Sequence, residues 1–430
     1  MNNDKSRIYS LGLMLGIGST VFLAGCGVPA PGDGGGAGNG NDNGTGGVPR
    51  AFVGADTCAA CHPDIHADWS ETAHAGALDT LEAIGQGENE ECLPCHVVGF
   101  QEDGFVSRTE TPQLVGVQCE NCHGSATEHV ANPGDASLRP TINMSASLCG
   151  GCHTDPHHPT FDEWQLSKHA TALEGLRANP FANDECLECH SQDYRAAVED
   201  GQTPPTLDTA QLSIECATCH DPHGGVAQAN QLRKPIGNLC GECHTVEEVT
   251  VGGTPHHPQI EMLTGIGPLK EDGSGLQATH AHSSLAAAGG QACAQCHVVQ
   301  HAVDDPTEDN PNVTGHTFNP FDESITTHQA AEYTGCAGCH TETVAAALRS
   351  SLQSDVSTRL NALALFFDES SGSHIDPNAL SSVDQQKLAV AKFDYQFIDA
   401  DGSRGVHNPS LARATLDEAE RIVQELAAPQ

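Results

Sequence analysis

The segment "CAACHPDIHADWSETAHAGAL", residues 58–78, joins a C-x-x-C-H pentapeptide to a stretch that contains two further histidines, His66 and His74. The same pentapeptide occurs nine times in the chain, and together the nine copies use every cysteine except Cys26. Their first cysteines are Cys58, Cys92, Cys119, Cys149, Cys186, Cys216, Cys240, Cys293 and Cys336.

The pentapeptide has the spacing needed to attach a haem covalently. Two thiols two residues apart reach the two vinyl groups, and the histidine that follows binds the iron axially. Zinc sites and redox dithiols also use C-x-x-C, but they do not require a histidine after the second cysteine. Because all nine copies have it, we expect nine covalently attached haem c groups. The attachment cysteines are Cys58, Cys61, Cys92, Cys95, Cys119, Cys122, Cys149, Cys152, Cys186, Cys189, Cys216, Cys219, Cys240, Cys243, Cys293, Cys296, Cys336 and Cys339; the proximal histidines are His62, His96, His123, His153, His190, His220, His244, His297 and His340.

The composition indicates what fills the interior. Only 4% of the 430 residues are aromatic, and residues 58–340 provide about 31 residues for each motif. Side-chain cores of ordinary size do not fit at that density. The prediction is a mostly α fold with extensive loops, in which stacked haems form the core.

The charge restricts the partners. Lys and Arg number 18 against 57 Asp and Glu, a formal net charge of −39. Nucleic acid binding needs clustered cations, so it is excluded. We expect redox protein partners with basic docking surfaces.

The N-terminus has the features of an export signal. Lys5 and Arg7 precede an apolar stretch, and "LAGC", Leu23–Cys26, resembles a bacterial lipobox with Cys26 as the lipidated residue. No Asp follows Cys26, which favours the outer membrane over the inner one. The expected order is a signal peptide and lipobox over 1–26, a flexible Gly/Asn-rich tether over 27–50, a nine-haem body over 51–340 and a helical segment over 341–430.

The body contains an internal repeat. Cys58, Cys149 and Cys240 follow one another at intervals of 91 residues. "DWSETAHAGAL" (68–78) aligns with "EWQLSKHATAL" (163–173). The predicted three-haem repeats are 58–148, 149–239 and 240–340, the third being the least regular.

Sixteen histidines lie outside the motifs and are available as second axial ligands. His74 and His169 are the strongest candidates because they occupy equivalent positions in two repeats. The predicted distal ligands are His74, His129, His158, His169, His223, His257, His282, His316 and His407. Of the others, His157 and His256 are interpreted as hydrogen-bonding neighbours, His280, His301 and His328 as competing ligands, and His66 and His374 as non-ligands.

Three stretches resemble a known family: "CAACHPDIHADWSETAHAGAL", "CHVVGF…GVQCENCHGSATEH" and "GVHNP". They are similar to the multihaem cytochrome c superfamily that includes cytochrome c-554 and the octahaem hydroxylamine oxidoreductases, over roughly residues 55–425. The resemblance implies bis-histidine haems in stacked parallel and perpendicular pairs, and it supports His74, His129, His158, His169, His257 and His407 as ligands. Nine motifs fit neither the four-haem nor the eight-haem pattern, and the C-x-x-C-K site of many nitrite reductases is absent.

The last part of the chain has helical periodicity and no cysteine. Apolar residues recur at helical spacing over 344–363, "SVDQ" (382–385) resembles a capping box, and Asn408 with Pro409 is typical of a helix start. Three helices are predicted. "DADGSRG" (399–405) resembles half a calcium-binding loop, but no glutamate follows at the required offset, so no such site is expected.

Three functions are compatible with these features. The first is a lipid-anchored carrier that passes electrons between redox partners at the periplasm or outer membrane, or to an extracellular acceptor, with no catalytic residue. The alternative is an oxidoreductase with one open-site haem acting on a small nitrogen or sulfur compound. Its open site would belong to the Cys293 or Cys336 motif, where ligand assignment is weakest. The third is self-assembly into an oligomer or filament.

Overall fold

The computed structural model describes residues 52–224, 229–246, 249–287, 292–320 and 334–428. Within these ranges the chain consists of helices, turns and loops, with isolated β-bridges but no extended strand. The prediction of a mostly helical fold with extensive loops is confirmed for this part of the chain. The predicted signal peptide, the tether, Cys26 and His328 lie outside the described residues.

The first repeat is built from six short helices around a small apolar core. Leu78, Val97 and Phe105 belong to this core, which contains eight buried residues. The helices are α1 Ala55–Ala59, α2 Pro63–Ser70, α3 Ala77–Ala83, α4 Leu93–His96, α5 Cys119–His123 and α6 Thr127–Ala131.

The second repeat has the same plan. Its buried apolar cluster is smaller still, with four residues that include Leu173 and Leu187. The helices are α7 Ala146–Gly150, α8 Thr160–Gln165, α9 Ala172–Arg177, α10 Leu187–His190, α11 Gln192–Glu199 and α12 Cys216–Cys219.

A tryptophan makes the same hydrogen bond in both repeats. Trp69 of α2 donates from Nε1 to the carbonyl oxygen of Val117 at 3.0 Å, and Trp164 of α8 donates to that of Ile214 at 2.9 Å. Each acceptor lies just before a C-x-x-C-H motif. The alignment of 68–78 with 163–173 therefore corresponds to matching local structure.

The third repeat and its connections also contain short helices. They are α13 Ile236–Gly241, α14 Gln259–Thr264, α15 Ser283–Ala287 and α16 Ala292–His297. Single 3-10 turns occur along the chain at η1 Pro112–Leu114, η2 Ala136–Leu138, η3 Asp184–Cys186, η4 Ala229–Gln231, η5 Thr334–Cys336 and η6 Pro377–Ala379.

Three long helices close the chain, as the periodicity predicts: α17 Glu342–Phe367, α18 Ser382–Asp401 and α19 Pro409–Ala427. Asn408 caps α19 by accepting from the backbone N–H of Leu411 at 2.9 Å. The predicted cap of α18 is wrong by one residue. Ser381, not Ser382, accepts from the N–H of Asp384, because its side chain also donates to the Asp384 carboxylate.

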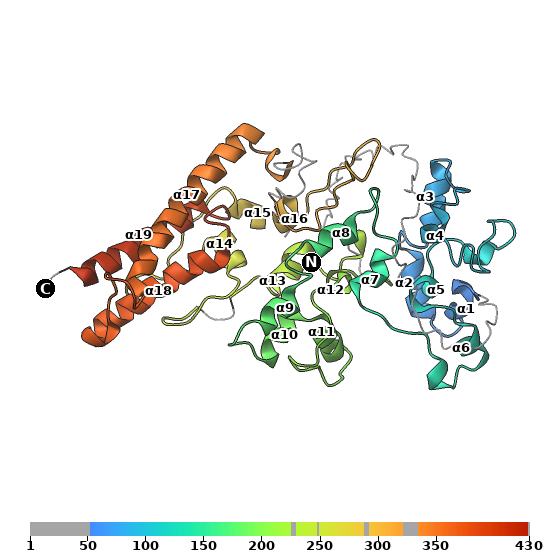
Figure 1. Cartoon of the computed structure of the whole chain (residues 1–430), viewed down its shortest axis with the longest axis horizontal. Helices are drawn as coiled ribbons and strands as arrows, with labels where there is room; N and C mark the ends of the chain where they lie inside the picture. Colours follow the sequence, from blue (N-terminus) through green and yellow to red (C-terminus); the bar gives the residue numbers. More distant parts are fainter. Residues whose placement is uncertain (1–51, 225–228, 247–248, 288–291, 321–333, 429–430) are drawn as a thin grey trace, which may run out of the picture.

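The C-terminal helices pack on one another and on a loop of the third repeat. Their core contains twenty buried hydrophobic residues, among them Met262 of α14, Leu269 of the loop after it and Leu411 of α19. In Figure 1 these helices form the end of the molecule opposite the first repeat. None of the helices in the described ranges is long and apolar enough to cross a membrane.

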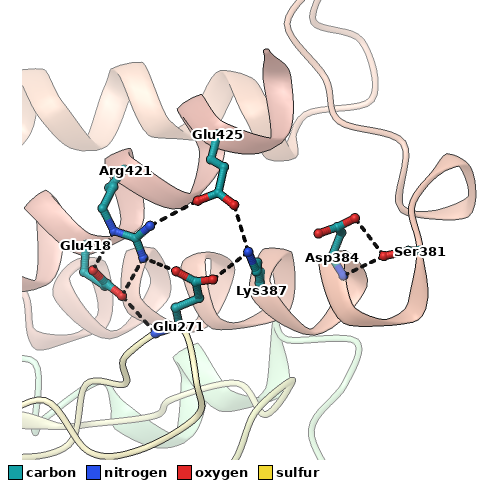
Figure 2. Close-up of polar contacts among 7 residues, drawn as sticks. All are labelled: Glu271, Ser381, Asp384, Lys387, Glu418, Arg421 and Glu425. Carbon is teal, nitrogen blue, oxygen red and sulfur yellow. Dashed lines mark hydrogen bonds and ion pairs between the residues drawn. The ribbon is translucent and has the colours of Figure 1, made fainter. Parts of the chain in front are cut away.

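Ion pairs join the loop to the helices at the surface. Glu271 contacts both Lys387 of α18 and Arg421 of α19 at 2.5 Å, and Lys387 also pairs with Glu425 at 2.8 Å (Figure 2). Glu418 accepts from the backbone N–H of Glu271 at 2.8 Å. The network connects the third repeat to the C-terminal helices.

Candidate haem-binding sites

The local fold of the motifs gathers their three binding groups. Several motifs form or end a short helix, for example α5 Cys119–His123 and α16 Ala292–His297. Residues three and four apart lie on one face of a helix, so both thiols and the histidine face the same side. Both cysteines of eight motifs, and Cys95 of the ninth, are free thiols. Cys92 is disulfide-bonded in the structure. Attachment of haem to the cysteines of all nine motifs stays a prediction.

The proximal histidines face other histidines across a gap suited to a metal ion. Two metal–imidazole bonds of about 2 Å in line place the nitrogens about 4 Å apart, and the ring centroids about 6 Å apart. Seven motif histidines in the described residues have such a partner, and one of them, His244, also lies 5.5 Å from His257. The centroid separations are 6.0 Å for His153–His74, 6.3 Å for His96–His158, 6.1 Å for His123–His223, 6.2 Å for His244–His169, 6.3 Å for His220–His316, 6.1 Å for His297–His407 and 6.5 Å for His340–His282.

An eighth motif histidine faces two neighbouring rings. The ring of His190 lies 5.8 Å from that of His257 and 6.3 Å from that of His256. One nitrogen of each of these three side chains lies within 4.8 Å of the others, which is close enough for one metal ion. His256 is exposed, whereas burial lowers the pKa of His257 to about 4 and keeps its ring neutral. His257 is therefore the better ligand of the two.

Hydrogen bonds hold many of these rings in a tautomer that suits metal binding. A histidine that donates from Nδ1 leaves the Nε2 lone pair free for a metal. The backbone carbonyl of Ala77 lies 2.8 Å from Nδ1 of His96. The equivalent contacts are His123 with Thr141, His220 with Asn230 and His282 with Val406 at 2.8 Å, and His297 with Phe318 at 2.9 Å.

Burial keeps several candidate ligands uncharged. It lowers the pKa of His169 and of His316 to about 4, and neighbouring imidazoles act in the same direction. Burial also lowers the pKa of His74. A neutral imidazole is the form that binds a metal, so these rings are prepared for ligation at neutral pH.

One candidate ligand has a carboxylate as its partner. Nδ1 of His407 lies 2.5 Å from Oδ1 of Asp401, whose side chain has no exposed surface. Burial alone would lower the pKa of His407, but the Asp401 charge outweighs it and raises this pKa. Sequence reasoning did not find Asp401, although it lies in the "DADGSRG" stretch.

The ninth motif histidine, His62, differs from the other eight. His62 has no ring contact among the described residues, and Nδ1 of His129 is buried there without a hydrogen-bond partner. The two histidines lie on segments that Glu120 connects. Its carboxylate accepts from the N–H groups of Val53 and Gly54, just before α1, and from that of Ala126, just before α6, each at 2.9 Å.

The Cys293 and Cys336 motifs, where ligand assignment from the sequence is weakest, also have histidines nearby. Both proximal histidines face a partner, supplied by the loop before α15 or by the turn between α18 and α19. Both partners are among the predicted distal ligands, although neither is in register with His169 in the repeat alignment. The competitor His280 lies 4.9 Å from His282 rather than facing a motif histidine. His66 contacts Trp69 and Asp56, in keeping with the prediction that it is not a ligand.

Thiols of different motifs interact in pairs. The interaction between Cys58 and Cys119, for instance, raises the pKa of the first and lowers that of the second to about 7. The same kind of pairing joins Cys95 with Cys152, Cys149 with Cys216, Cys189 with Cys243, and Cys240 with Cys293. Weaker electrostatic interactions join Cys122 with Cys149, Cys219 with Cys240, and Cys296 with Cys336.

Comparison with known sequences agrees with the geometry. Residues 57–124 and 148–221 match the family model "Cytochrome c554 and c-prime", and residues 211–248 match the model "Doubled CXXCH motif". Cytochrome c-554 of Nitrosomonas europaea is 34% identical over 89 residues, which are 17% of this chain and 38% of that protein. The multihaem cytochrome MtrA of Shewanella baltica is 26% identical over 178 residues, which are 36% of this chain and 51% of that protein. The chain thus spans about half or less of the length of these relatives.

Comparison with solved structures addresses the fold. The crystal structure of the outer cell wall cytochrome OcwA has a TM-score of 0.66 at 22% identity, and the match covers 87% of this chain and 100% of that one. The chain therefore has the fold of multihaem cytochromes, and the predicted resemblance is confirmed. The motifs and the relatives also support covalent binding of haem c.

Proposed function

We propose that this multihaem cytochrome is an electron carrier that binds nine haem c groups and passes electrons along a row of them. Each bound iron supplies one-electron chemistry between Fe(III) and Fe(II). The observation that supports this role best is the set of facing imidazoles. A haem with two protein ligands exchanges electrons without binding a substrate, and eight motif histidines in the described residues have a facing partner.

The ligand assignment follows from these pairs. The predicted distal ligands serve motifs in other parts of the chain rather than their own. His74 of the first repeat serves the Cys149 motif, and His169 of the second serves the Cys240 motif. His129 is assigned to His62 because both remain and Glu120 joins their segments. The full assignment is His62 with His129, His96 with His158, His123 with His223, His153 with His74, His190 with His257, His220 with His316, His244 with His169, His297 with His407 and His340 with His282.

The thiol pairs support an order for the haems. Covalently attached groups must lie near their cysteines, so motifs whose thiols interact hold neighbouring haems. The Cys92 and Cys186 motifs each connect through a thiol pair to one other motif, at Cys152 and Cys243. They are therefore side branches. The main row runs through the Cys58, Cys119, Cys149, Cys216, Cys240, Cys293 and Cys336 motifs.

The same pattern changes the proposed boundaries of the repeats. Cys240 interacts with Cys293 as Cys149 does with Cys216, the third motif of its repeat. The third repeat then lacks a middle haem, and the Cys336 motif begins a fourth repeat. The proposed ligand of the Cys336 motif, His282, lies in the preceding repeat. In the same way, His74 of the first repeat is the proposed ligand of the Cys149 motif of the second.

The charge supports the kind of partner proposed. A net charge of −39 attracts basic surfaces and repels nucleic acid, and it steers docking at low ionic strength. The lipobox-like "LAGC" supports export and attachment to a membrane by a lipid at Cys26, at the outer membrane, periplasm or cell surface. Filament formation stays a separate hypothesis, tested by microscopy of purified protein.

Carbon monoxide tests the carrier against the oxidoreductase. It binds ferrous haem only where an axial position is open. We expect reduced holo-protein to show no carbon monoxide adduct, and to be reoxidised completely on mixing with a soluble ferric complex. An adduct, together with turnover of nitrite or hydroxylamine, would favour the oxidoreductase. In that case His129→Ala, which removes the proposed distal ligand of His62, would add no further adduct if the open position already lies at that motif.

A further inference from the structure

Asp401 occupies a special place at the end of α18. Its side chain has no exposed surface, and its Oδ1 lies 2.5 Å from Nδ1 of His407. The other carboxylate oxygen accepts hydrogen bonds from the backbone N–H of Ser403, at 3.3 Å, and from its hydroxyl. The backbone N–H of His407 in turn donates to the Ser403 hydroxyl at 3.2 Å. The turn between α18 and α19 thus fixes both the carboxylate and the imidazole.

This arrangement differs from that of the other candidate ligands. Nδ1 of several other candidate ligands also has a hydrogen-bond partner in the structure, but in those cases the partner is a neutral oxygen. For His282 it is the backbone carbonyl of Val406. Asp221 lies 3.8 Å from Nδ1 of His223, but both side chains are partly exposed and the distance exceeds that of a hydrogen bond. Among the described residues, His407 alone combines a candidate ligand with a buried carboxylate in hydrogen-bond contact.

An anionic hydrogen-bond acceptor at Nδ1 changes how strongly the imidazole donates electrons to a metal through Nε2. It attracts the Nδ1 proton, which makes Nε2 a stronger donor and favours the more highly charged iron. The hydrogen bond is strong because one partner is ionised and water is excluded. Fe(III) is then stabilised relative to Fe(II), and the reduction potential falls.

We propose that Asp401 lowers the reduction potential of the haem at the Cys293 motif below that of the other haems, so that this haem controls electron passage to the Cys336 motif. The inference rests on the proposed function, in which His407 is the distal ligand of this haem. The Cys293 motif lies between the Cys240 and Cys336 motifs in the row of interacting thiols. One electron reduces Fe(III) to Fe(II) there, and no bond at the iron forms or breaks. An electron that moves along the row must therefore pass an uphill step.

The test compares Asp401→Asn with Asp399→Asn in holo-protein at one pH and ionic strength. Asp399 is a partly exposed residue of the same turn that pairs with Arg404 at 2.7 Å, so its variant controls for the loss of one charge. In a spectroelectrochemical titration we expect Asp401→Asn to raise the reduction potential of the most negative haem by at least 59 mV. This shift corresponds to a tenfold change in the equilibrium constant for one-electron reduction. Asp399→Asn should give a smaller shift. Equal shifts in the two variants, or an unchanged most negative component, would overturn the proposal.

A second variant gives the opposite sign. Ser403→Ala removes the hydrogen bond from the Ser403 hydroxyl to the carboxylate and keeps the one from the backbone N–H. The carboxylate charge should then act more strongly on His407 and move the same component to a more negative potential. A positive shift in this variant would contradict the proposal. So would a high-spin signal in Asp401→Asn alone, because it would mean that Asp401 holds His407 in place instead of tuning it. If His407→Ala keeps every haem low-spin, the ligand assignment itself fails, and that result is distinct from an unshifted potential.

Discussion

The C-terminal helices and the motif-bearing repeats fill their interiors in different ways. The core of α17, α18 and α19 contains twenty buried hydrophobic residues, including those from the adjoining loop region. The two apolar clusters of the first and second repeats contain eight and four. Pairs of facing imidazoles and groups of thiols occupy the repeats instead. We therefore expect the C-terminal region to be stabilised by its own side chains and the repeats to depend on the groups they bind.

The largest expected difference between the two regions is in how much ordered structure each keeps when haem is removed. Chain produced without its first 26 residues, in cells that attach no haem, is expected to lose ordered structure in the repeats and keep α17–α19. Hydrogen exchange measured by mass spectrometry would show fast exchange over 52–224, in the first two repeats, and slow exchange in the core of the C-terminal helices, which includes Met262 and Leu269. Slow exchange in the haem-free repeats would contradict the comparison.

Loss of one distal ligand should change one haem and leave the others as they are. His74→Ala is expected to convert one low-spin haem to high-spin and to open it to carbon monoxide, because His74 faces His153. His66→Ala is the matched control from the same repeat, since His66 contacts Trp69 and Asp56 instead. High-spin signals in both variants, or in neither, would argue against the assignment.

The C-terminal region should respond to pH through a buried carboxyl. Burial raises the pKa of Asp394 to about 8, and only one of its oxygens has a hydrogen-bond partner, the N–H of Leu269. The folded state therefore binds this proton more tightly than the unfolded state. Stability is greatest below the unfolded pKa of about 4, and it falls by up to about 1.4 kcal/mol per pH unit as pH rises toward 8.

The measurement is thermal unfolding of the C-terminal helices between pH 5 and 8. Asp394→Asn should remove this part of the pH dependence, and Asp355→Asn, at an exposed site on α17, should leave it intact. If the wild-type slope persists in Asp394→Asn, a different group is responsible.

The smallest effect is expected from the surface network of Figure 2. Arg421 contacts Glu271, Glu418 and Glu425, but its side chain is 46% exposed. Arg421→Ala should lower the free energy of unfolding by less than about 1 kcal/mol. Arg359, 18% exposed and paired with Asp417 and Glu420, should cost more when changed to Ala. The reverse order in chemical denaturation would mean that the network matters more than burial.

The sequence predicts most of what depends on local pattern. Motif spacing indicates the haem-binding groups, periodicity indicates the three long helices, and the match of Trp69 with Trp164 identifies the repeat. The pairing of histidines could not be predicted, because facing rings come from different repeats. The structure places His316 opposite His220 and His407 opposite His297.

The side chains that contact the candidate ligands could not be predicted from the sequence either. The stretch "DADGSRG" resembles half a calcium-binding loop, and this pattern does not indicate that its Asp401 contacts His407. Such a contact depends on the turn between two helices, and a residue pattern does not specify how that turn folds. The cap of α18 was misplaced for a related reason, because two adjacent serines are both suitable and only the fold selects Ser381.

The central claim is that nine haems each have two histidine ligands. Low-temperature electron paramagnetic resonance of the oxidised holo-protein tests it directly when the spins are counted against total haem. The account predicts nine haems per chain, all low-spin, with no high-spin ferric signal. A high-spin signal in the purified wild-type protein, or fewer than nine haems per chain, would contradict it.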